Sequence, residues 1–378
     1  MEKLLLIPGP SPVHPRIIRA VSEPTVSHVG QEMAADLSEA LKNLSKIVFC
    51  EKGEPFIIAG AGTLSMEIAL LNTAARGDRI LVLSQGYFGD RMGQICESFG
   101  LSCDIVRSRW GSAVRAEELA AKITENKYDV VVVTHVDTGT GACAPVKEYG
   151  EVLRDRGVLY IVDGVCATGG IEERMDDWGI DVVLTAAQKC FGAPPGLAID
   201  VFSERAVAKR KSLPAVPAYY SDILRWMPIM HDPFKYFSTP CVNEVRGFCE
   251  ATRIVMEEGI EARFARHKKT AEAFRAALSG LGFTFFTEKE FLAETLSVVN
   301  YPAGVEDKAF RSTYSANGVV VAGGLGETAG KLFRMGHMGN LSSAQIVFAL
   351  DALERTLSTL RYRFERGSAV QAAKSVLG

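Results

Sequence analysis

The stretch Val182-Val183-Leu184-Thr185-Ala186-Ala187-Gln188-Lys189-Cys190-Phe191-Gly192 decides how the rest of the chain is interpreted. Its first residues are apolar and rich in β-branched side chains, which is typical of a buried strand. The strand runs directly into Lys189. A lysine at the carboxyl end of a core strand is unusual, because a buried ammonium costs free energy unless it is paired or deprotonated.

Two interpretations of Lys189 follow from its position. In a pocket of low dielectric, its amine can form a Schiff base with an aldehyde cofactor such as pyridoxal phosphate. Alternatively, the side chain extends along apolar surface and places its charge in water at the end of the strand. This segment alone does not distinguish the two interpretations, so the rest of the chain has to be considered.

Length and composition restrict the class of protein. The 378 residues are too many for one ordinary core, so we expect two domains. Hydrophobic residues make up 47% and charged residues 23%, as in a soluble globular protein. The formal net charge of −3 offers no basic surface for nucleic acid, and no apolar run is long enough to cross a membrane.

The N-terminus and the cysteines indicate the compartment. The opening segment, residues 1–8, has too short an apolar run for a signal peptide. The eight cysteines are scattered, with neither a CxxC pair nor a Cys/His cluster. Such cysteines are mostly small core residues in a reducing compartment, so we expect a cytoplasmic protein without a metal site.

Strands alternate with helices from about residue 55 to residue 202, which predicts a mostly parallel sheet covered on both faces. The expected strands are 55–59, 79–84, 128–135, 158–163, 181–187 and 196–202, and the expected helices are 33–48, 64–71 and 146–156. An irregular aromatic segment at 217–240 precedes a long helix at 259–281. The rest predicts a smaller α+β unit, with strands 294–299, 318–322 and 332–337 and helices 308–317 and 342–362.

Several chemically distinctive residues follow these strands at their carboxyl ends, where ligands gather in parallel sheets. The carboxylate of Asp163 can accept a hydrogen bond from the ring nitrogen of a pyridine, although an aspartate there can also cap a turn. The coincidence of positions predicts one shared site. The residues at strand ends are Gly60, Phe88, Thr138, Asp163 and Lys189.

The turn Gly60-Ala61-Gly62-Thr63 connects a strand to a helix. The free amides of a first helical turn and the helix dipole favour an anion, and Thr63 can cap the helix and donate its hydroxyl to a phosphate. The turn is neither GxGxxG nor a P-loop, and similar turns carry glycines only for packing. The turn therefore either binds a phosphate or carries its glycines only for packing.

Three further positions are candidates for the same site. Phe88, bracketed by glycines, either stacks on a planar ring or closes the edge of the core. Arg334 interrupts an apolar strand, and its guanidinium either binds a substrate carboxylate through two parallel bonds or forms an internal salt bridge. Gly9, within Pro8-Gly9-Pro10, allows close approach of another group, unless the segment is an ordinary N-terminal arm.

Together these residues resemble the class V aminotransferases, which are fold type I pyridoxal phosphate enzymes. The similarity is greatest to the alanine–glyoxylate and serine–pyruvate branch, and it runs from Pro8 to the final helix. It rests on an ordered series of motifs: PGP, GAGT, GYFGDR, THVDTGTG, VDGV, AAQKC, YFSTP and LFRMGH.

The resemblance implies an α/β fold with a large domain, built on a mostly parallel seven-stranded sheet, and a smaller C-terminal α+β domain. We expect an N-terminal arm at 1–20, a large cofactor-binding domain at 21–255 and a small domain at 256–378. It also implies that the active unit is a homodimer whose two sites are shared between subunits.

The resemblance implies roles for individual residues as well. Lys189 would form the Schiff base and move a proton, and Asp163 would pair with the pyridine nitrogen. Phe88 would stack on the ring, where many relatives carry tryptophan. Arg334 would bind the substrate α-carboxylate, with Gly9 lining the same space. The other implied cofactor-binding residues are Gly60, Ala61, Gly62, Thr63, Thr138 and Gln188, with Tyr236 and Thr239 reaching the phosphate of the other subunit.

Two departures from the relatives concern the substrate. The segment 27–30 lacks the arginine that many relatives place after His28, and Gly139 stands where a serine is common. We expect an aminotransferase that moves an amino group from a small amino acid, alanine or serine, to a 2-oxo acid such as glyoxylate or pyruvate.

Three alternatives to this activity stay open. The donor could be 2-aminoethylphosphonate or ureidoglycine, and the former would need extra positive charge in the pocket. A lyase such as cysteine desulfurase would need a cysteine after Cys249, which the chain lacks, and a histidine at Gln188. A non-catalytic accessory subunit, as some relatives labelled soluble hydrogenase small subunits suggest, would not need the lysine, aspartate and arginine.

Overall fold

Seven strands form the larger sheet of the computed structural model, which describes residues 3–378. Their order is β2-β8-β7-β6-β5-β3-β4, and only β8 runs antiparallel to its neighbours. This confirms the predicted mostly parallel seven-stranded sheet. The strands are β2 (Glu54–Ala59), β3 (Arg79–Ser84), β4 (Ser102–Arg107), β5 (Val130–Thr134), β6 (Leu159–Asp163), β7 (Val182–Ala186) and β8 (Leu197–Phe202).

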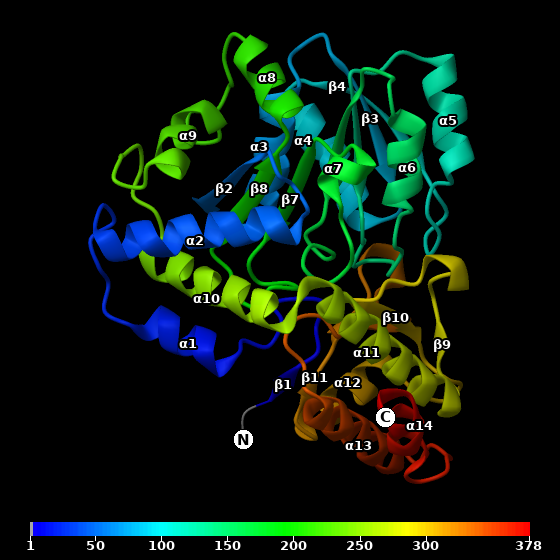
Figure 1. Ribbon diagram of the computed structural model, residues 1–378. Coiled ribbons are helices and arrows are strands. Elements are labelled where there is room, and N and C mark those ends of the chain that lie inside the picture. The colour runs from blue at the N-terminus through cyan, green and yellow to red at the C-terminus, as the bar shows by residue number, and fades with distance from the viewer. Residues whose placement is uncertain (1–2) are drawn as a thin grey trace.

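The central strands are buried on both faces, because their side chains are apolar without alternation. Every residue of β5, β6 and β7 is buried. Helices cover the sheet in front and behind (Figure 1). These helices are α2 (Gln31–Ile47), α3 (Gly62–Thr73), α4 (Tyr87–Ser98), α5 (Ala116–Glu125), α6 (Val146–Leu153), α7 (Met175–Trp178), α8 (Glu204–Ser212), α9 (Ile223–His231) and α10 (Val242–Glu258).

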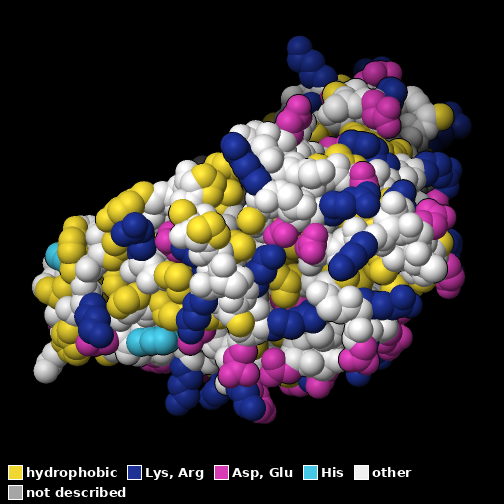
Figure 2. All heavy atoms as spheres, turned by 90° about the horizontal axis from the view of Figure 1, so that it is seen from above, with side chains coloured by type: hydrophobic (Ala, Val, Ile, Leu, Met, Phe, Trp, Pro, Cys, Tyr) yellow, Lys and Arg dark blue, Asp and Glu magenta, His cyan; other side chains and the backbone are white. Residues whose placement is uncertain are grey.

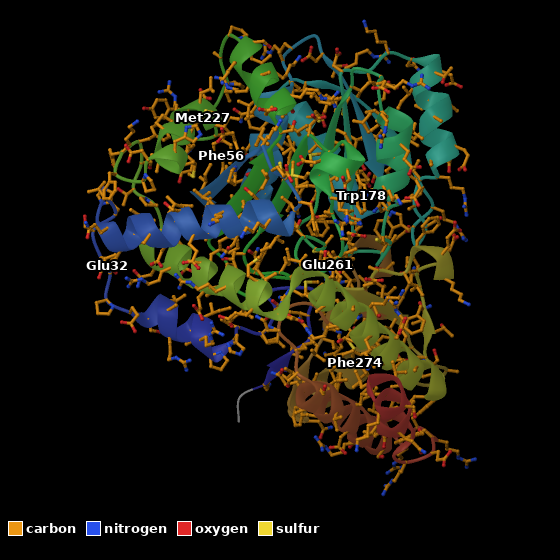
Figure 3. The ribbon with its side chains drawn as sticks, viewed as in Figure 1. Glu32, Phe56, Trp178, Met227, Glu261 and Phe274 are labelled. Carbon is orange, nitrogen blue, oxygen red and sulfur yellow. The ribbon has the colours of Figure 1, made fainter. Side chains whose placement is uncertain are left out.

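A second, four-stranded antiparallel sheet has the order β12-β13-β10-β9 and lies below the larger one in Figure 1. It has its own apolar core, in which Phe274 is fully buried, whereas Phe56 belongs to the core of the larger sheet (Figure 3). Its strands and helices are β9 (Thr284–Phe285), β10 (Leu296–Asn300), β12 (Ala322–Gly323), β13 (Leu332–Gly336), α11 (Ile260–Gly280), α12 (Asp307–Ala316), α13 (Ser343–Thr359) and α14 (Ser368–Leu377).

The N-terminal segment connects the two parts of the chain. Its first strand, β1 (Leu4–Leu5), pairs in parallel with β11 (Val319–Val320). The amide of Gly336 then donates to the carbonyl of Leu6 at 2.8 Å, and the amide of Ser11 donates to the carbonyl of Gln188 at 3.0 Å. The segment therefore runs from the smaller part to the loop that carries Lys189, before α1 (Pro15–Ser22) begins.

Prediction and structure agree best where the apolar pattern is strong. All six strands expected between residues 55 and 202 are present, and their ends differ by at most two residues. Strand β4 was not predicted, because it is an edge strand whose Ser-Cys-Asp start has no apolar run. The segment 217–240, expected to be irregular, contains α9, which buries Trp226.

The expected strand 318–322 is wrong as a single element. It divides into β11 and β12, which pair with different sheets. The tail after Arg363 contains α14, whose alanines pack in the smaller core. The domain limits expected at 20/21 and 255/256 fall inside α1 and α10, and the division stays a prediction. Within residues 3–378, every helix is too short or too polar to span a bilayer.

Candidate active site

A pocket of about 160 Å³ lies at the carboxyl ends of β5, β6 and β7, next to the first turns of α3 and α4. Seven of the predicted site residues line it: Ala61, Gly62, Thr63, Phe88, Asp163, Gln188 and Lys189. Six further lining residues were not singled out from the sequence: Met66, Arg91, Thr134, Val136, Val165 and Cys166. The sheet thus brings together the strand ends that the sequence predicted to meet.

The side chain of Lys189 turns toward the N-terminal arm. Its amine donates a hydrogen bond to the carbonyl oxygen of Pro8. Gly9 has a φ of +93°, and a Cβ added there would lie 2.7 Å from the lysine Nζ. The hydroxyl of Ser11, which was not predicted, donates to the Lys189 carbonyl at 2.6 Å. The lysine is therefore enclosed by the arm, which argues against the alternative that it extends into water.

Asp163 places a buried carboxylate in the same pocket. It is 2% exposed and accepts hydrogen bonds from the Thr134 hydroxyl at 3.2 Å and from the Val165 amide at 3.1 Å. Burial raises the pKa of this carboxyl to about 6. No cation of residues 3–378 lies within 4.0 Å of it. The bond to Val165 is a local turn cap, as the alternative interpretation expected. Within residues 3–378, the hydroxyl of Thr134 is the hydrogen-bond partner of the second carboxylate oxygen.

The turn before α3 supplies free backbone amides. The helix begins at Gly62 and its N-cap, Ala61, makes no side-chain cap. The prediction that Thr63 caps the helix is therefore wrong, because Thr63 lies within the first turn and is exposed. A Cβ on Gly62 would lie 3.1 Å from Val165, so the helix start is packed against the end of β6. Such a start binds anions well.

Phe88 is held in place by a residue that the sequence did not reveal. The buried carboxylate of Asp137 accepts hydrogen bonds from the amides of Phe88 and Gly139, both at 2.7 Å. A Cβ on Gly139 would lie 2.9 Å from this carboxylate and 3.2 Å from the Cβ of Tyr87. A side chain at position 139 would therefore crowd the Asp137 carboxylate and Tyr87.

Arg334 lies in the middle of β13, outside the lining of the pocket. Its Nε donates to the Gly323 carbonyl at 2.7 Å and its Nη1 to the Thr138 carbonyl at 3.3 Å. The internal salt bridge considered above is wrong, because no carboxylate of residues 3–378 lies within 4.0 Å of the guanidinium. Burial lowers the pKa of Arg334, while Asp137 raises it. Thr138 does not line the pocket either, and its carbonyl accepts the hydrogen bond from Arg334.

Three other predicted residues lie outside the pocket. Gly60 is the first residue of the turn after β2, and its amide donates to the Gly196 carbonyl at 2.9 Å. Tyr236 is 63% exposed, and its hydroxyl lies 3.5 Å from that of Thr239. Figure 2 shows hydrophobic side chains gathered on the side of the molecule where α9 lies in Figure 1. The large exposed apolar side chains include Val29, Tyr219, Phe234 and Tyr236.

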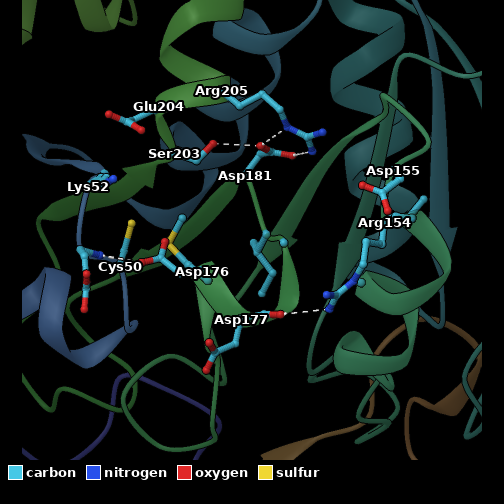
Figure 4. A pocket seen from close by; sticks show the side chains of 17 residues that line it. Cys50, Lys52, Arg154, Asp155, Asp176, Asp177, Asp181, Ser203, Glu204 and Arg205 are labelled. Carbon is cyan, nitrogen blue, oxygen red and sulfur yellow. Dashed lines mark hydrogen bonds and ion pairs between the residues drawn. The ribbon is translucent and has the colours of Figure 1, made fainter.

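A larger hollow of about 640 Å³ lies at the opposite edge of the sheet (Figure 4). The carboxylate of Asp181 there accepts from Ser203 at 2.9 Å and pairs with Arg205, and the Asp176 carboxylate accepts from the Glu51 amide at 2.8 Å. The two carboxylates already have hydrogen-bond or ion-pair partners among these neighbours. No predicted site residue lines this hollow. The smaller pocket at the carboxyl ends is the candidate site.

The donor set of that pocket fits pyridoxal phosphate. It offers an amine at Lys189, a buried carboxylate at Asp163, an aromatic ring at Phe88 and the free amides of the α3 start. The buried Gln188 Oε1 has no hydrogen-bond partner within residues 3–378, so an acceptor is also left for a ligand.

Comparison with known proteins identifies the family. The model of the aminotransferase class-V family matches residues 14–347. The chain is 36% identical to an uncharacterised aminotransferase of Methanocaldococcus jannaschii, over 100% of this chain and 98% of that protein. It is 33% identical to alanine–glyoxylate aminotransferase 1 of Saccharomyces cerevisiae, over 89% of this chain and 91% of that one.

The fold has a close counterpart among solved structures. Ureidoglycine–glyoxylate aminotransferase of Bacillus subtilis superposes with a TM-score of 0.94 at 27% identity, over 100% of this chain and 98% of that one. These matches confirm the resemblance inferred from the motifs. The chain belongs to the class V aminotransferases, a family of pyridoxal phosphate-dependent enzymes.

Proposed function

We propose that this aminotransferase moves an amino group from a small amino acid, alanine or serine, to a 2-oxo acid such as glyoxylate or pyruvate. The observation that carries the proposal is the meeting of Lys189 and Asp163 in one pocket of about 160 Å³. These two groups support the cofactor chemistry, whereas the choice of a small donor and acceptor rests on the resemblance described above.

Pyridoxal phosphate, when bound, would supply a ring that accepts electrons from the Cα–H bond of an amino acid. The amine of Lys189 would hold the cofactor aldehyde and, when free, accept and return the proton at the substrate Cα. The carboxylate of Asp163 would hold a proton on the ring nitrogen. Its buried position strengthens that interaction, because no water competes for the carboxylate.

The side chains of Phe88 and Arg334 would orient the reactants. Phe88 forms a wall of the pocket on which a flat ring can pack. The guanidinium of Arg334 has no acid partner within residues 3–378, so it is available to a substrate α-carboxylate. Fixing that carboxylate would set the direction of the Cα–H bond, which is an effect of orientation.

Two relatives that are named for their substrates support the proposed acceptor more than the proposed donor. The yeast and Bacillus proteins are both named for glyoxylate, whereas their donors are alanine and ureidoglycine. Ureidoglycine therefore stays the main alternative donor, and 2-aminoethylphosphonate a weaker one. Cysteine desulfurase is disfavoured, because the sequence has no cysteine after Cys249 and Cys249 itself is buried in the large core.

The proposal includes a homodimer with shared sites. Tyr236 and Thr239 lie near each other on the surface, away from the pocket of their own chain. Exposed apolar side chains around them are typical of a surface that another protein covers. A second subunit would bring these hydroxyls to the phosphate of its partner.

The activity test uses purified protein with pyridoxal phosphate, alanine and glyoxylate. We expect glycine and pyruvate to form, and no glycine above background with Lys189→Ala. Serine, aspartate, ureidoglycine and 2-aminoethylphosphonate, each offered with glyoxylate, then rank the donors. Absence of glycine from both alanine and serine would overturn the proposed donors. A cofactor spectrum that changes with another amino acid would leave the aminotransferase assignment standing.

A further inference from the structure

Arg91 lies on α4 at the mouth of the pocket, and its role is not explained by the functions above. Its guanidinium carbon is 4.7 Å from the centre of the Phe88 ring and 5.2 Å from the centre of the Tyr87 ring. The side chain also lines the pocket together with Thr63 and Lys189. Contact with two rings restricts a long side chain, so the cation is already positioned before a ligand arrives.

The charge of Arg91 has no acid partner in the part of the chain that the structure describes. Within residues 3–378, no carboxylate lies within 4.0 Å of its guanidinium, although Asp90 is its neighbour in sequence. Asp90 instead pairs with Arg107, at 2.8 Å. The only hydrogen bond of the Arg91 side chain in this part of the chain joins its Nη1 to the Thr63 hydroxyl, at 3.5 Å. An arginine in such surroundings is available to an anion.

Thr63 shows where that anion would lie. It belongs to the first turn of α3, where the amides of Gly62 and Thr63 have no hydrogen-bond partner within residues 3–378, whereas the Leu64 amide donates to the Ala61 carbonyl at 2.8 Å. The Arg91 guanidinium and these amides therefore approach the same end of the pocket from two helices. A phosphate monoester suits this arrangement, because a guanidinium fork and several N–H groups can share its oxygens.

We propose that Arg91 binds the phosphate group of the cofactor, together with the first turn of α3 of the same chain. This inference rests on the proposed function, since it requires that the pocket binds pyridoxal phosphate. A different role for Arg91 would be to support the Phe88 ring only. The two roles differ in their dependence on the phosphate, so a pair of ligands distinguishes them.

The experiment measures binding of pyridoxal phosphate and of pyridoxal, which lacks the phosphate, to cofactor-free protein by absorbance titration. Inorganic phosphate, tested as a competitor, is a third probe that has no ring. The variants are Arg91→Gln and Arg91→Lys, and Arg107→Gln is the matched control, because Arg107 is an exposed arginine that pairs with Asp90. Thermal unfolding of each cofactor-free variant verifies that it is folded.

We expect Arg91→Gln to weaken pyridoxal phosphate binding about tenfold or more, the usual effect of losing a charge-assisted hydrogen bond. Competition by inorganic phosphate should weaken as well, whereas binding of pyridoxal should change less than about twofold. Arg91→Lys should retain part of the phosphate affinity, because it keeps the charge but not the fork. Arg107→Gln should bind all three ligands like the wild type.

Equal weakening of pyridoxal and pyridoxal phosphate in Arg91→Gln would overturn the inference in favour of support for the Phe88 ring. Unchanged binding of both would overturn it too, with the proposed function intact. Failure of the wild type to bind pyridoxal phosphate at all would overturn the proposed function and this inference together.

Discussion

The guanidinium of Arg334 donates a hydrogen bond to the backbone carbonyl of Thr138, at 3.3 Å. This contact joins β13 of the smaller sheet to the loop that follows β5 of the larger one. The same loop contains Asp137, which binds the amide of Phe88. One loop thus connects the arginine proposed for the substrate carboxylate with the ring proposed to pack on the cofactor.

Replacing Arg334 tests the role of this contact. We expect Arg334→Lys to lower kcat/KM for alanine by roughly 10- to 100-fold, mainly through a higher KM, because a lysine cannot form two parallel bonds to a carboxylate. Steady-state kinetics measures it. Arg355→Lys is the control, since Arg355 pairs with Asp351 on the exposed side of α13. An unchanged KM in Arg334→Lys would contradict the assignment.

Gly9 and Gly157 form a matched pair for testing the arm. Both have positive φ, but an added Cβ would meet Lys189 at Gly9, whereas at Gly157 it would meet no atom of residues 3–378 within 4 Å. Each alanine substitution should cost about 1 kcal/mol of stability from the backbone alone. Only Gly9→Ala should also displace the lysine and weaken cofactor uptake, measured by absorbance. Equal cofactor uptake in both variants would show that the arm does not position Lys189.

Asp163 should make the cofactor-free protein less stable as the pH rises. Its carboxyl has a pKa of about 6 in the folded chain, above the ordinary aspartate value of 3.8. The folded state therefore binds the extra proton between about pH 4 and pH 6, so its contribution to stability falls across that window and stays low above it. At pH 7 the penalty is on the order of 2–3 kcal/mol.

Asp163→Asn removes this titration. We expect the cofactor-free variant to be more stable than the wild type at pH 7 and nearly equal to it at pH 4, as measured by urea unfolding. The same variant should bind pyridoxal phosphate more weakly, because an amide cannot hold a proton on the ring nitrogen. A variant less stable than the wild type at pH 7 would contradict the predicted burial cost.

Gly139→Ser tests the fit between Gly139 and Asp137. The added Cβ would lie 2.9 Å from the Asp137 carboxylate and 3.2 Å from Tyr87. We expect a loss of about 1–3 kcal/mol in unfolding free energy from overpacking. Gly280→Ser is the control, because no described atom of the chain lies within 4 Å of the added Cβ there, and its effect should stay below about 0.5 kcal/mol. Similar effects at both positions would contradict the tight fit.

The shared site can be tested by mixing subunits. Lys189→Ala and Tyr236→Ala should each be poorly active as homodimers. In a mixed dimer, one site would hold the native lysine of one subunit and the native tyrosine of the other. Random exchange should therefore restore about a quarter of the wild-type activity. A mixture no more active than its two components would contradict a shared site.

Much of the fold could be predicted because its determinants are local. Runs of β-branched residues specify buried strands, and a parallel sheet brings their carboxyl ends to one edge. Asp163 and Lys189 could thus be placed in one pocket before any coordinates were known. Strand β4 was not predicted, because an edge strand that is partly exposed does not need a run of apolar residues.

Other contacts of the site could not be predicted, because they are long-range bonds to backbone groups. The Ser11 hydroxyl binds the Lys189 carbonyl, and the Asp137 carboxylate binds the Phe88 amide, across 178 and 49 residues of sequence. Every residue has a backbone carbonyl, and every residue except proline has a backbone N–H. The identity of such a partner therefore cannot be recognised from the sequence.

The sequence by itself therefore determined which residues end the strands and what chemistry they bring to one edge of the sheet. Only the tertiary structure decided what holds those residues in position, and that Arg91 and Arg334 are left without acid partners in residues 3–378. The physical reason is that strand pattern is a property of neighbouring residues, whereas the pairing of a charge depends on everything that folding places around it.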